Sequence, residues 1–239
     1  MQAALRSKVL DDLRERISRI EGPTDRGPAV PGQSTGFEAL NCLLAQRGLK
    51  PGTLIEWQSG SEGSGTGSLA LRVAGHLLRE EGICVVIDCW GEFYPPGMRA
   101  LGIPLERTVI VRPRPGMTAW WAWEQSLRCP GVVLTLGWAE TIDDRVYRRL
   151  QLAVEAGGGL GFLLRPAACR AATSWAATRL AVEALPSAAT GRRVRVTLLR
   201  GRSEARQNFV ELELNDEAGD VSVAAELADP TPPGGARSR

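Results

Sequence analysis

The sequence predicts an α/β protein with a mostly parallel sheet that helices flank on both faces. Between residues 53 and 164, short apolar runs alternate with helical patterns, which is typical of a parallel sheet. The run from Ile83 to Ile87 is apolar without interruption, as in a strand buried on both faces. Near the C-terminus, strand patterns follow one another with short turns between them, which predicts an antiparallel extension.

The individual elements follow from these periodicities. Strands are predicted at 53–57, 83–88, 108–112, 132–136, 160–164, 194–199, 209–214 and 221–224. Helices are predicted at 37–44, 69–81, 97–102, 117–129, 142–156 and 173–184.

A separate helix is predicted at the N-terminus, over residues 1–22. Its apolar positions recur at three- and four-residue steps and include Leu5, Val9, Leu13, Ile17 and Ile20. A Pro/Gly-rich linker at 23–33 separates it from a core at 34–227, and a Pro/Gly-rich tail at 228–239 is expected to be disordered. Two interpretations of the helix stay open: it folds onto its own domain, or it is an arm that binds a partner.

Composition narrows the class of protein. The chain has 239 residues and is 44% hydrophobic, enough for one large domain, and its net charge of +2 predicts no polyanion binding by bulk charge. Its five cysteines form no C-x-x-C pair and it has one histidine, so we expect a reduced, cytoplasmic protein with no metal site. No apolar run reaches about 18 residues, so no membrane span is expected.

A glycine-rich stretch follows the predicted strand at 53–57 and precedes a helix, where a phosphate-binding loop would lie. In the template G-x-x-x-x-G-K-[ST], Gly60 and Gly65 take the glycine positions, but Thr66 replaces the lysine and Gly67 replaces the hydroxyl residue. Without a functional role, glycines here would serve the tight bend alone. The degenerate loop comprises Gly60, Ser61, Glu62, Gly63, Ser64, Gly65, Thr66, Gly67 and Ser68.

Several separated segments, in order along residues 34–215, resemble the RecA-like recombinase superfamily. They are Ser34-Thr35-Gly36 with Leu40-Asn41, Gly48-Leu49 with Gly52, the loop itself, Val86-Ile87-Asp88, Leu163 to Pro166, and Ser174 to Leu180. The resemblance implies a RecA-like core, in which the segment from Ser174 to Leu180 would be the helix that enters the final strands.

Departures from the recombinase pattern at four parts of the site affect catalysis, the first part being the phosphate loop. The lysine and hydroxyl of the phosphate loop are missing, as described. Trp90 stands at the position of the catalytic glutamate, which Glu92 could supply only with an insertion. The strand at 132–136 ends without a carboxylate, and Arg165-Pro166 replaces the sensing glutamine. We therefore expect no ATP hydrolysis and no cofactor, although backbone N–H groups at the helix N-terminus leave room for weak nucleotide or anion binding.

A RecA-like body without an ATPase site resembles the bacterial ImuA/SulA-type accessory proteins of damage-induced mutagenesis. The resemblance implies a non-catalytic adaptor in error-prone translesion DNA synthesis. Its expected partners are a Y-family-polymerase-like subunit, an error-prone C-family polymerase complex and RecA itself. Inhibition of cell division, the activity of the SulA branch, is an alternative that nothing in the residues selects.

A DNA-binding module is a second alternative, because arginines gather in the last strands. Basic clusters can contact phosphates, but they can equally be solvated faces that pair with acids. The candidate contacts are Arg192, Arg193, Arg195, Arg200, Arg202 and Arg206.

Tryptophans mark two places in the chain. Trp57, Trp90 and Trp138 lie at the C-terminal ends of predicted strands, the rim where parallel sheets bind ligands. We expect them to fill the vacated nucleotide pocket. Trp120, Trp121 and Trp123 share one predicted helix at a spacing that puts them on more than one face.

Overall fold

The computed structural model describes residues 31–79, 81–172, 174–186, 191–201, 207–214 and 221–223. From Gly32 onward these residues belong to one compact unit, Gly32–Arg239. The predicted arm at 1–22, the predicted tail at 228–239 and most of the predicted linker lie outside the described residues.

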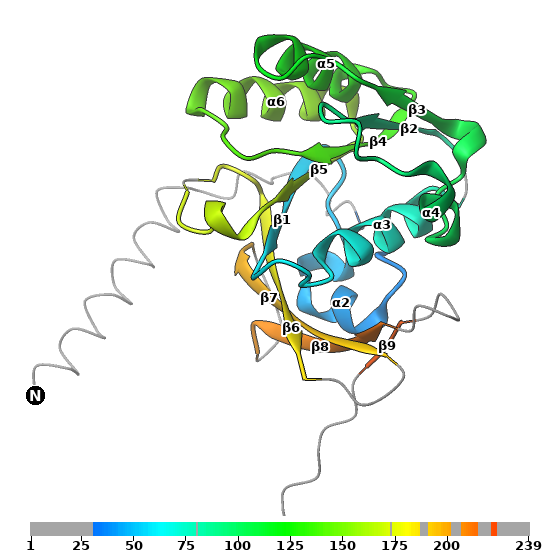
Figure 1. Cartoon of the computed structure of the whole chain (residues 1–239), viewed down its shortest axis with the longest axis vertical. Helices are drawn as coiled ribbons and strands as arrows, with labels where there is room; N and C mark the ends of the chain where they lie inside the picture. The colour runs from blue at the N-terminus through cyan, green and yellow to red at the C-terminus, as the bar shows by residue number, and fades with distance from the viewer. Residues whose placement is uncertain are drawn as a thin grey trace, which may run out of the picture. The chain divides into compact units, whose positions relative to one another are not determined.

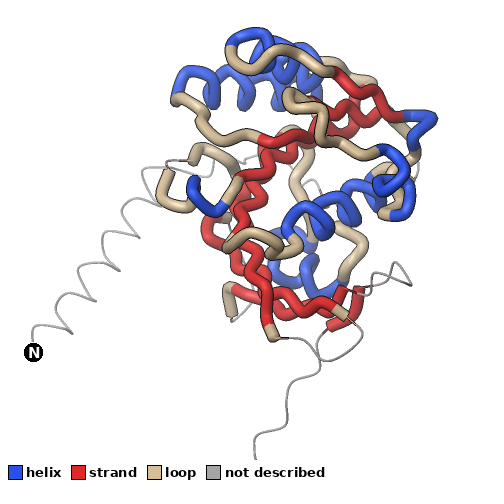
Figure 2. Tube along the Cα trace, in the orientation of Figure 1, coloured by secondary structure: helices blue, strands red, loops and turns tan. Residues whose placement is uncertain are grey.

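The described strands form one mixed sheet in the order β3-β2-β4-β5-β1-β6-β7-β8-β9 (Figures 1 and 2). All neighbours from β3 to β6 pair in parallel, and β6 to β9 pair antiparallel. The mostly parallel sheet with an antiparallel extension is thus confirmed. The strands are β1 (Thr53–Ser59), β2 (Ile83–Ile87), β3 (Thr108–Val111), β4 (Val132–Trp138), β5 (Leu160–Arg165), β6 (Thr178–Leu185), β7 (Arg192–Arg200), β8 (Phe209–Leu214) and β9 (Val221–Val223).

Helices cover both faces of the sheet. Figure 1 shows α5 and α6 on one side of the strands and α3 and α4 on the other. Two separate apolar clusters, one on each face, hold these layers together. The helices are α2 (Glu38–Leu43), α3 (Thr66–Leu77), α4 (Pro95–Ala100), α5 (Met117–Arg128) and α6 (Asp144–Gly157).

Strand β1 lies between β5 and β6 and has side chains in both layers. Ile55 and Trp57 pack in the cluster that contains α3, whereas Leu54 packs in the cluster that contains α6. Because side chains alternate along a strand, the carboxylate of Glu56 points toward α6, where Tyr147 donates a hydrogen bond to it. The last residue of β1, Ser59, leads directly into the glycine-rich loop.

The predicted helix at 173–184 is wrong: within it, residues 178 onward form strand β6, which pairs with both β1 and β7. The alanine content of this segment favours a helix, but Leu180 and Val182 alternate into the α3-side core. The open edge of β1 supplies hydrogen-bond partners that decide the outcome, because tertiary pairing overrides local preference. The segment from Ser174 to Leu180 is therefore a loop that enters a strand.

No helix among the described residues is long and apolar enough to cross a membrane. The same part of the chain contains no cluster of three or more histidine, cysteine, aspartate or glutamate side chains that could hold a metal ion.

Candidate functional site

The glycine-rich loop leaves β1 and ends where α3 begins at Thr66. The Gly60 amide donates a hydrogen bond to the Val182 carbonyl at 2.8 Å, and a Cβ at Gly60 would lie only 2.9 Å from that oxygen. Gly65 precedes the helix with a φ of 81°, a conformation that favours glycine. The two glycines that fit the template therefore have structural reasons of their own.

Thr66, at the position of the missing lysine, does not reach out from the loop. It is 3% exposed, and its hydroxyl lies 2.7 Å from the hydroxyl of Ser64, which is equally buried. Ser61, Glu62 and Gly63 form the exposed tip of the loop. The loop thus keeps its bend, and the two buried hydroxyls of Ser64 and Thr66 lie within hydrogen-bond distance of each other.

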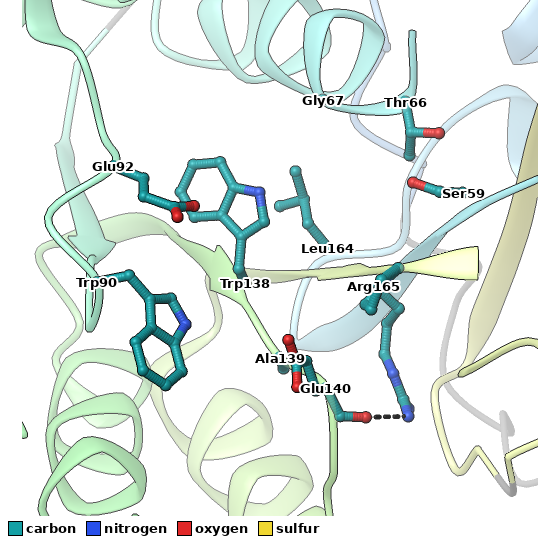
Figure 3. Close-up of a pocket in the computed structure, with 11 residues that line it drawn as sticks. Ser59, Thr66, Gly67, Trp90, Glu92, Trp138, Ala139, Glu140, Leu164 and Arg165 are labelled. Atoms are coloured by element: carbon teal, nitrogen blue, oxygen red, sulfur yellow. Dashed lines mark hydrogen bonds between the residues drawn. The ribbon is translucent and has the colours of Figure 1, made fainter. Parts of the chain in front are cut away.

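A cavity of about 430 Å³ opens beside the first turn of α3 (Figure 3). Thr66 and Gly67 form one wall, and the ends of neighbouring strands and their loops form the others. This is the C-terminal edge of the parallel strands, where open α/β sheets bind ligands. The remaining lining residues are Ser59, Trp90, Glu92, Trp138, Ala139, Glu140, Leu164, Arg165 and Pro166.

The expectation that tryptophans fill this pocket is wrong, because the cavity is open. Trp57 is fully buried and packs against Phe162, with ring centroids 5.5 Å apart. Trp90 and Trp138 stand in the wall of the cavity. Trp138 is held by an edge contact with Phe93, whereas Trp90 is 60% exposed.

Arg165 is the one arginine among the lining residues of the described cavity, and its guanidinium faces away from it (Figure 3). The side chain is 1% exposed. It donates to the Glu140 carbonyl at 2.8 Å and to the Tyr147 hydroxyl at 3.3 Å, and lies 3.5 Å from the Glu56 carboxylate. This arginine, which replaces the sensing glutamine in the resemblance, is therefore committed to the core.

Glu56 is the centre of a buried charge cluster that we define as Glu56, Tyr147, Arg165 and Arg179. Glu56 is fully buried; it accepts a hydrogen bond from Tyr147 at 2.7 Å. The Nε of Arg179 lies 2.7 Å from the other carboxylate oxygen of Glu56. The two atoms form an ion pair, but their geometry is not that of a hydrogen bond. Burial and the Glu56 charge raise the pKa of Tyr147 to about 12. This cluster was not predicted from the sequence, although a glutamate between apolar residues of a buried strand was a signal for it.

Asp88, directly after β2, shapes the loop that leads to the cavity. Its carboxylate is 2% exposed, pairs with Arg112 Nε at 3.1 Å and accepts the Glu92 amide at 2.9 Å. Glu92 is thereby held at the cavity with its carboxylate exposed. Together with the exposed Glu140, it gives the rim a negative charge that no free cation of the described lining offsets.

Three of the candidate DNA-contact arginines on β7, Arg193, Arg195 and Arg200, are engaged with carboxylates or with the backbone. Arg193 lies 3.2 Å and Arg195 2.6 Å from the Glu211 carboxylate, and Arg195 also stacks on the Phe209 ring. Arg200 donates to the Ser174 carbonyl at 2.6 Å. Arg192 is exposed at the start of the strand, whereas Arg202 and Arg206 lie outside the described residues. The predicted arm residues Leu5 to Ile20 also lie outside them.

The three tryptophans of α5 have different surroundings. Trp123 is 1% exposed, so packing of the helix against the sheet accounts for it. Trp121 is 59% exposed, so helix packing does not account for it. Trp120 lines a second cavity of about 230 Å³, which shares Trp90, Trp138, Ala139 and Glu140 with the first.

Comparison with known proteins identifies the fold. The structure of the RadB recombinase superposes with a TM-score of 0.59 at 16% identity, covering 77% of this chain and 96% of that one. No family model matches the chain.

Three sequence relatives match shorter stretches. RecA of Chlorobium chlorochromatii is 35% identical over 41% of this chain and 28% of its own length. ImuA of Caulobacter vibrioides is 36% identical over 36% of this chain and 35% of its own length. The cell division inhibitor SulA of Photorhabdus laumondii is 32% identical over 33% of this chain and 44% of its own length. The chain thus spans less than half of each relative. It has a RecA-like fold, and part of its sequence is similar to part of the ImuA- and SulA-type proteins.

Proposed function

We propose that this chain is a non-catalytic RecA-like adaptor of damage-induced, error-prone translesion DNA synthesis, which acts through contacts with other proteins. The observation that carries the proposal is the cavity beside the degenerate loop. Thr66 is bound to Ser64 where a phosphate-gripping lysine would be, and the exposed charges of the cavity are the carboxylates of Glu92 and Glu140. Carboxylates repel the phosphates of a nucleotide, and nothing in the described lining replaces the lysine.

The relation to ImuA supports the biological setting. Through it we propose as partners a Y-family-polymerase-like subunit, an error-prone C-family polymerase complex and RecA. The predicted arm at 1–22 is the candidate docking element, since its apolar stripe from Leu5 to Ile20 would suit a partner surface.

The first experiment measures phosphate release from ATP and Mg²⁺ by the purified full chain, with and without single-stranded DNA. We expect release equal to the buffer background. Release above background that disappears in Glu92→Gln would overturn the non-catalytic role, because it would assign Glu92 as the base.

The second experiment tests the partner role. The full chain and a version without residues 1–22 are each used to capture a Y-family-polymerase-like subunit from the same host. Capture by the full chain and its loss on truncation supports the arm. Capture by both assigns binding to the core, and capture by neither contradicts the adaptor role.

Inhibition of cell division is a second candidate, which the partial match to SulA favours. Overproduction of the full chain in its host distinguishes the two, because an inhibitor of division gives filamentous cells without DNA damage, whereas a translesion adaptor leaves cell length unchanged.

A further inference from the structure

The two cavities at the C-terminal edge of the sheet adjoin each other, and we define them together as the tryptophan groove. Trp90, Trp138, Ala139 and Glu140 belong to both. The first cavity, of about 430 Å³, is walled by α3 and the strand ends, and the second, of about 230 Å³, by α5 and the loop before it. Their combined size is in the range of sites that hold a ligand or a few side chains.

The backbone that carries the groove's carboxylates is fixed. The Glu92 amide donates to Asp88, whose carboxylate is held by Arg112. The Glu140 carbonyl accepts from the buried Arg165, so the turn after β4 is tied to the core. Glu92 and Glu140 are therefore held by their backbones in the same wall as Trp90 and Trp138 (Figure 3).

The chemistry of the groove selects against anions and for a cation. Two exposed glutamates and two indole rings line the first cavity, and the guanidinium of its one arginine is turned away into the core. A guanidinium or ammonium group is attracted both by carboxylates and by the face of tryptophan. The phosphates of a nucleotide or of DNA would meet negative charge at the same place.

The second cavity has a different character, because its walls are mostly indole rings, proline and alanine. Trp120 and Trp123 line it from α5, and Pro115 from the preceding loop. Such a site suits an apolar side chain. Trp90, 60% exposed where the two cavities meet, resembles the exposed tryptophans at the centres of protein interfaces.

We propose that the tryptophan groove binds a peptide segment of a partner protein that places an arginine or lysine in the first cavity and a neighbouring apolar residue in the second. Glu92 and Glu140 pair with the cation, and Trp90 contacts both side chains. The inference rests on the proposed non-catalytic role, because a site that bound ATP for hydrolysis would have to accept phosphates.

The test selects random dodecapeptides on the full-length protein and measures the affinity of a labelled selected peptide by fluorescence anisotropy. We expect selected sequences to carry arginine or lysine beside an apolar residue. Trp90→Ala and Glu92→Gln should each weaken binding at least about tenfold. The matched controls are Trp121→Ala, which removes an equally exposed tryptophan outside the groove, and Glu106→Gln on the surface; both should stay within about twofold.

A charge reversal makes the test specific. Glu92→Arg should lose the basic peptide and bind a version of it with glutamate in place of the cation. Selection of no basic peptide, or equal affinity in the groove and control variants, overturns the proposal. So does loss of the peptide to competing single-stranded DNA, which would assign the groove to bases, or self-association that Trp90→Ala abolishes, which would assign it to a second copy. None of these results bears on ATP hydrolysis. The phosphate-release experiment therefore tests the non-catalytic role independently of the peptide proposal.

Discussion

Two sites near the end of β1 use carboxylates in opposite ways. In the buried charge cluster, Glu56 is fully enclosed and two arginines and a tyrosine surround it. In the tryptophan groove, Glu92 and Glu140 are exposed beside aromatic rings. Arg165 takes part in both sites: the residue lines the groove, whereas its guanidinium pairs with Glu56 in the cluster. The charge of Arg165 thus serves the stability of the sheet, and the groove is left with a negative rim.

The largest expected effect comes from the cluster. Glu56→Gln keeps the shape of the side chain but leaves Arg165 and Arg179 without their counter-charge, so we expect a loss of about 3–5 kcal/mol in the free energy of unfolding. Urea denaturation measures it. The same substitution at the exposed Glu92 should change stability by no more than about 0.5 kcal/mol. Equal losses of stability in Glu56→Gln and Glu92→Gln would contradict the proposed difference between the buried cluster and the exposed groove.

The hydroxyl of Tyr147 is the second test. Tyr147→Phe removes the 2.7 Å hydrogen bond to Glu56 and leaves a buried carboxylate with fewer partners, which should cost about 1–3 kcal/mol. Thermal and urea unfolding check this value. Tyr94→Phe is the control, because Tyr94 is 65% exposed. A loss as large in Tyr94→Phe as in Tyr147→Phe would contradict the role given to the cluster.

The loop between the two sites gives a third comparison, between two of its glycines. A Cβ at Gly60 would lie 2.9 Å from the Val182 carbonyl oxygen, so Gly60→Ala should destabilise the fold by about 1–3 kcal/mol. At Gly67, in the first turn of α3, an added Cβ would meet no atom within 4 Å beyond the adjacent residues and backbone of its own helix, so alanine should stabilise by about 0.5–1 kcal/mol. Stabilisation by both variants in urea denaturation would mean that β6 does not constrain the loop.

The smallest effect is expected on the arginine face of β7. Arg195 and Glu211 form a partly exposed pair, 2.6 Å apart. A double-mutant cycle with alanine at both positions should give a coupling of about 0.2–1 kcal/mol that falls with added salt. A coupling that equals the Glu56 effect and resists salt would show that burial is not what separates the two kinds of charge pair.

The sequence by itself determined the fold class and the place of the candidate site. Alternation of strands and helices gave the parallel sheet, and the turn between Gly60 and Gly65 identified the loop, because glycine spacing and apolar periodicity are local properties of the chain. The sequence alone also shows that Thr66 stands at the lysine position of the phosphate-loop template.

Tertiary structure decided what the residues around the loop do. The alanine-rich segment at 178–185 became a strand because β1 offered an open edge. Arg165 turned into the core because Glu56 and Tyr147, which lie 109 and 18 positions away in the numbering, meet it there. Trp90 and Trp138 line the cavity rather than fill it, and Trp138 is held there by packing against the α3-side core and by its contact with Phe93. Each of these outcomes depends on partners distant in the chain, which local pattern does not encode.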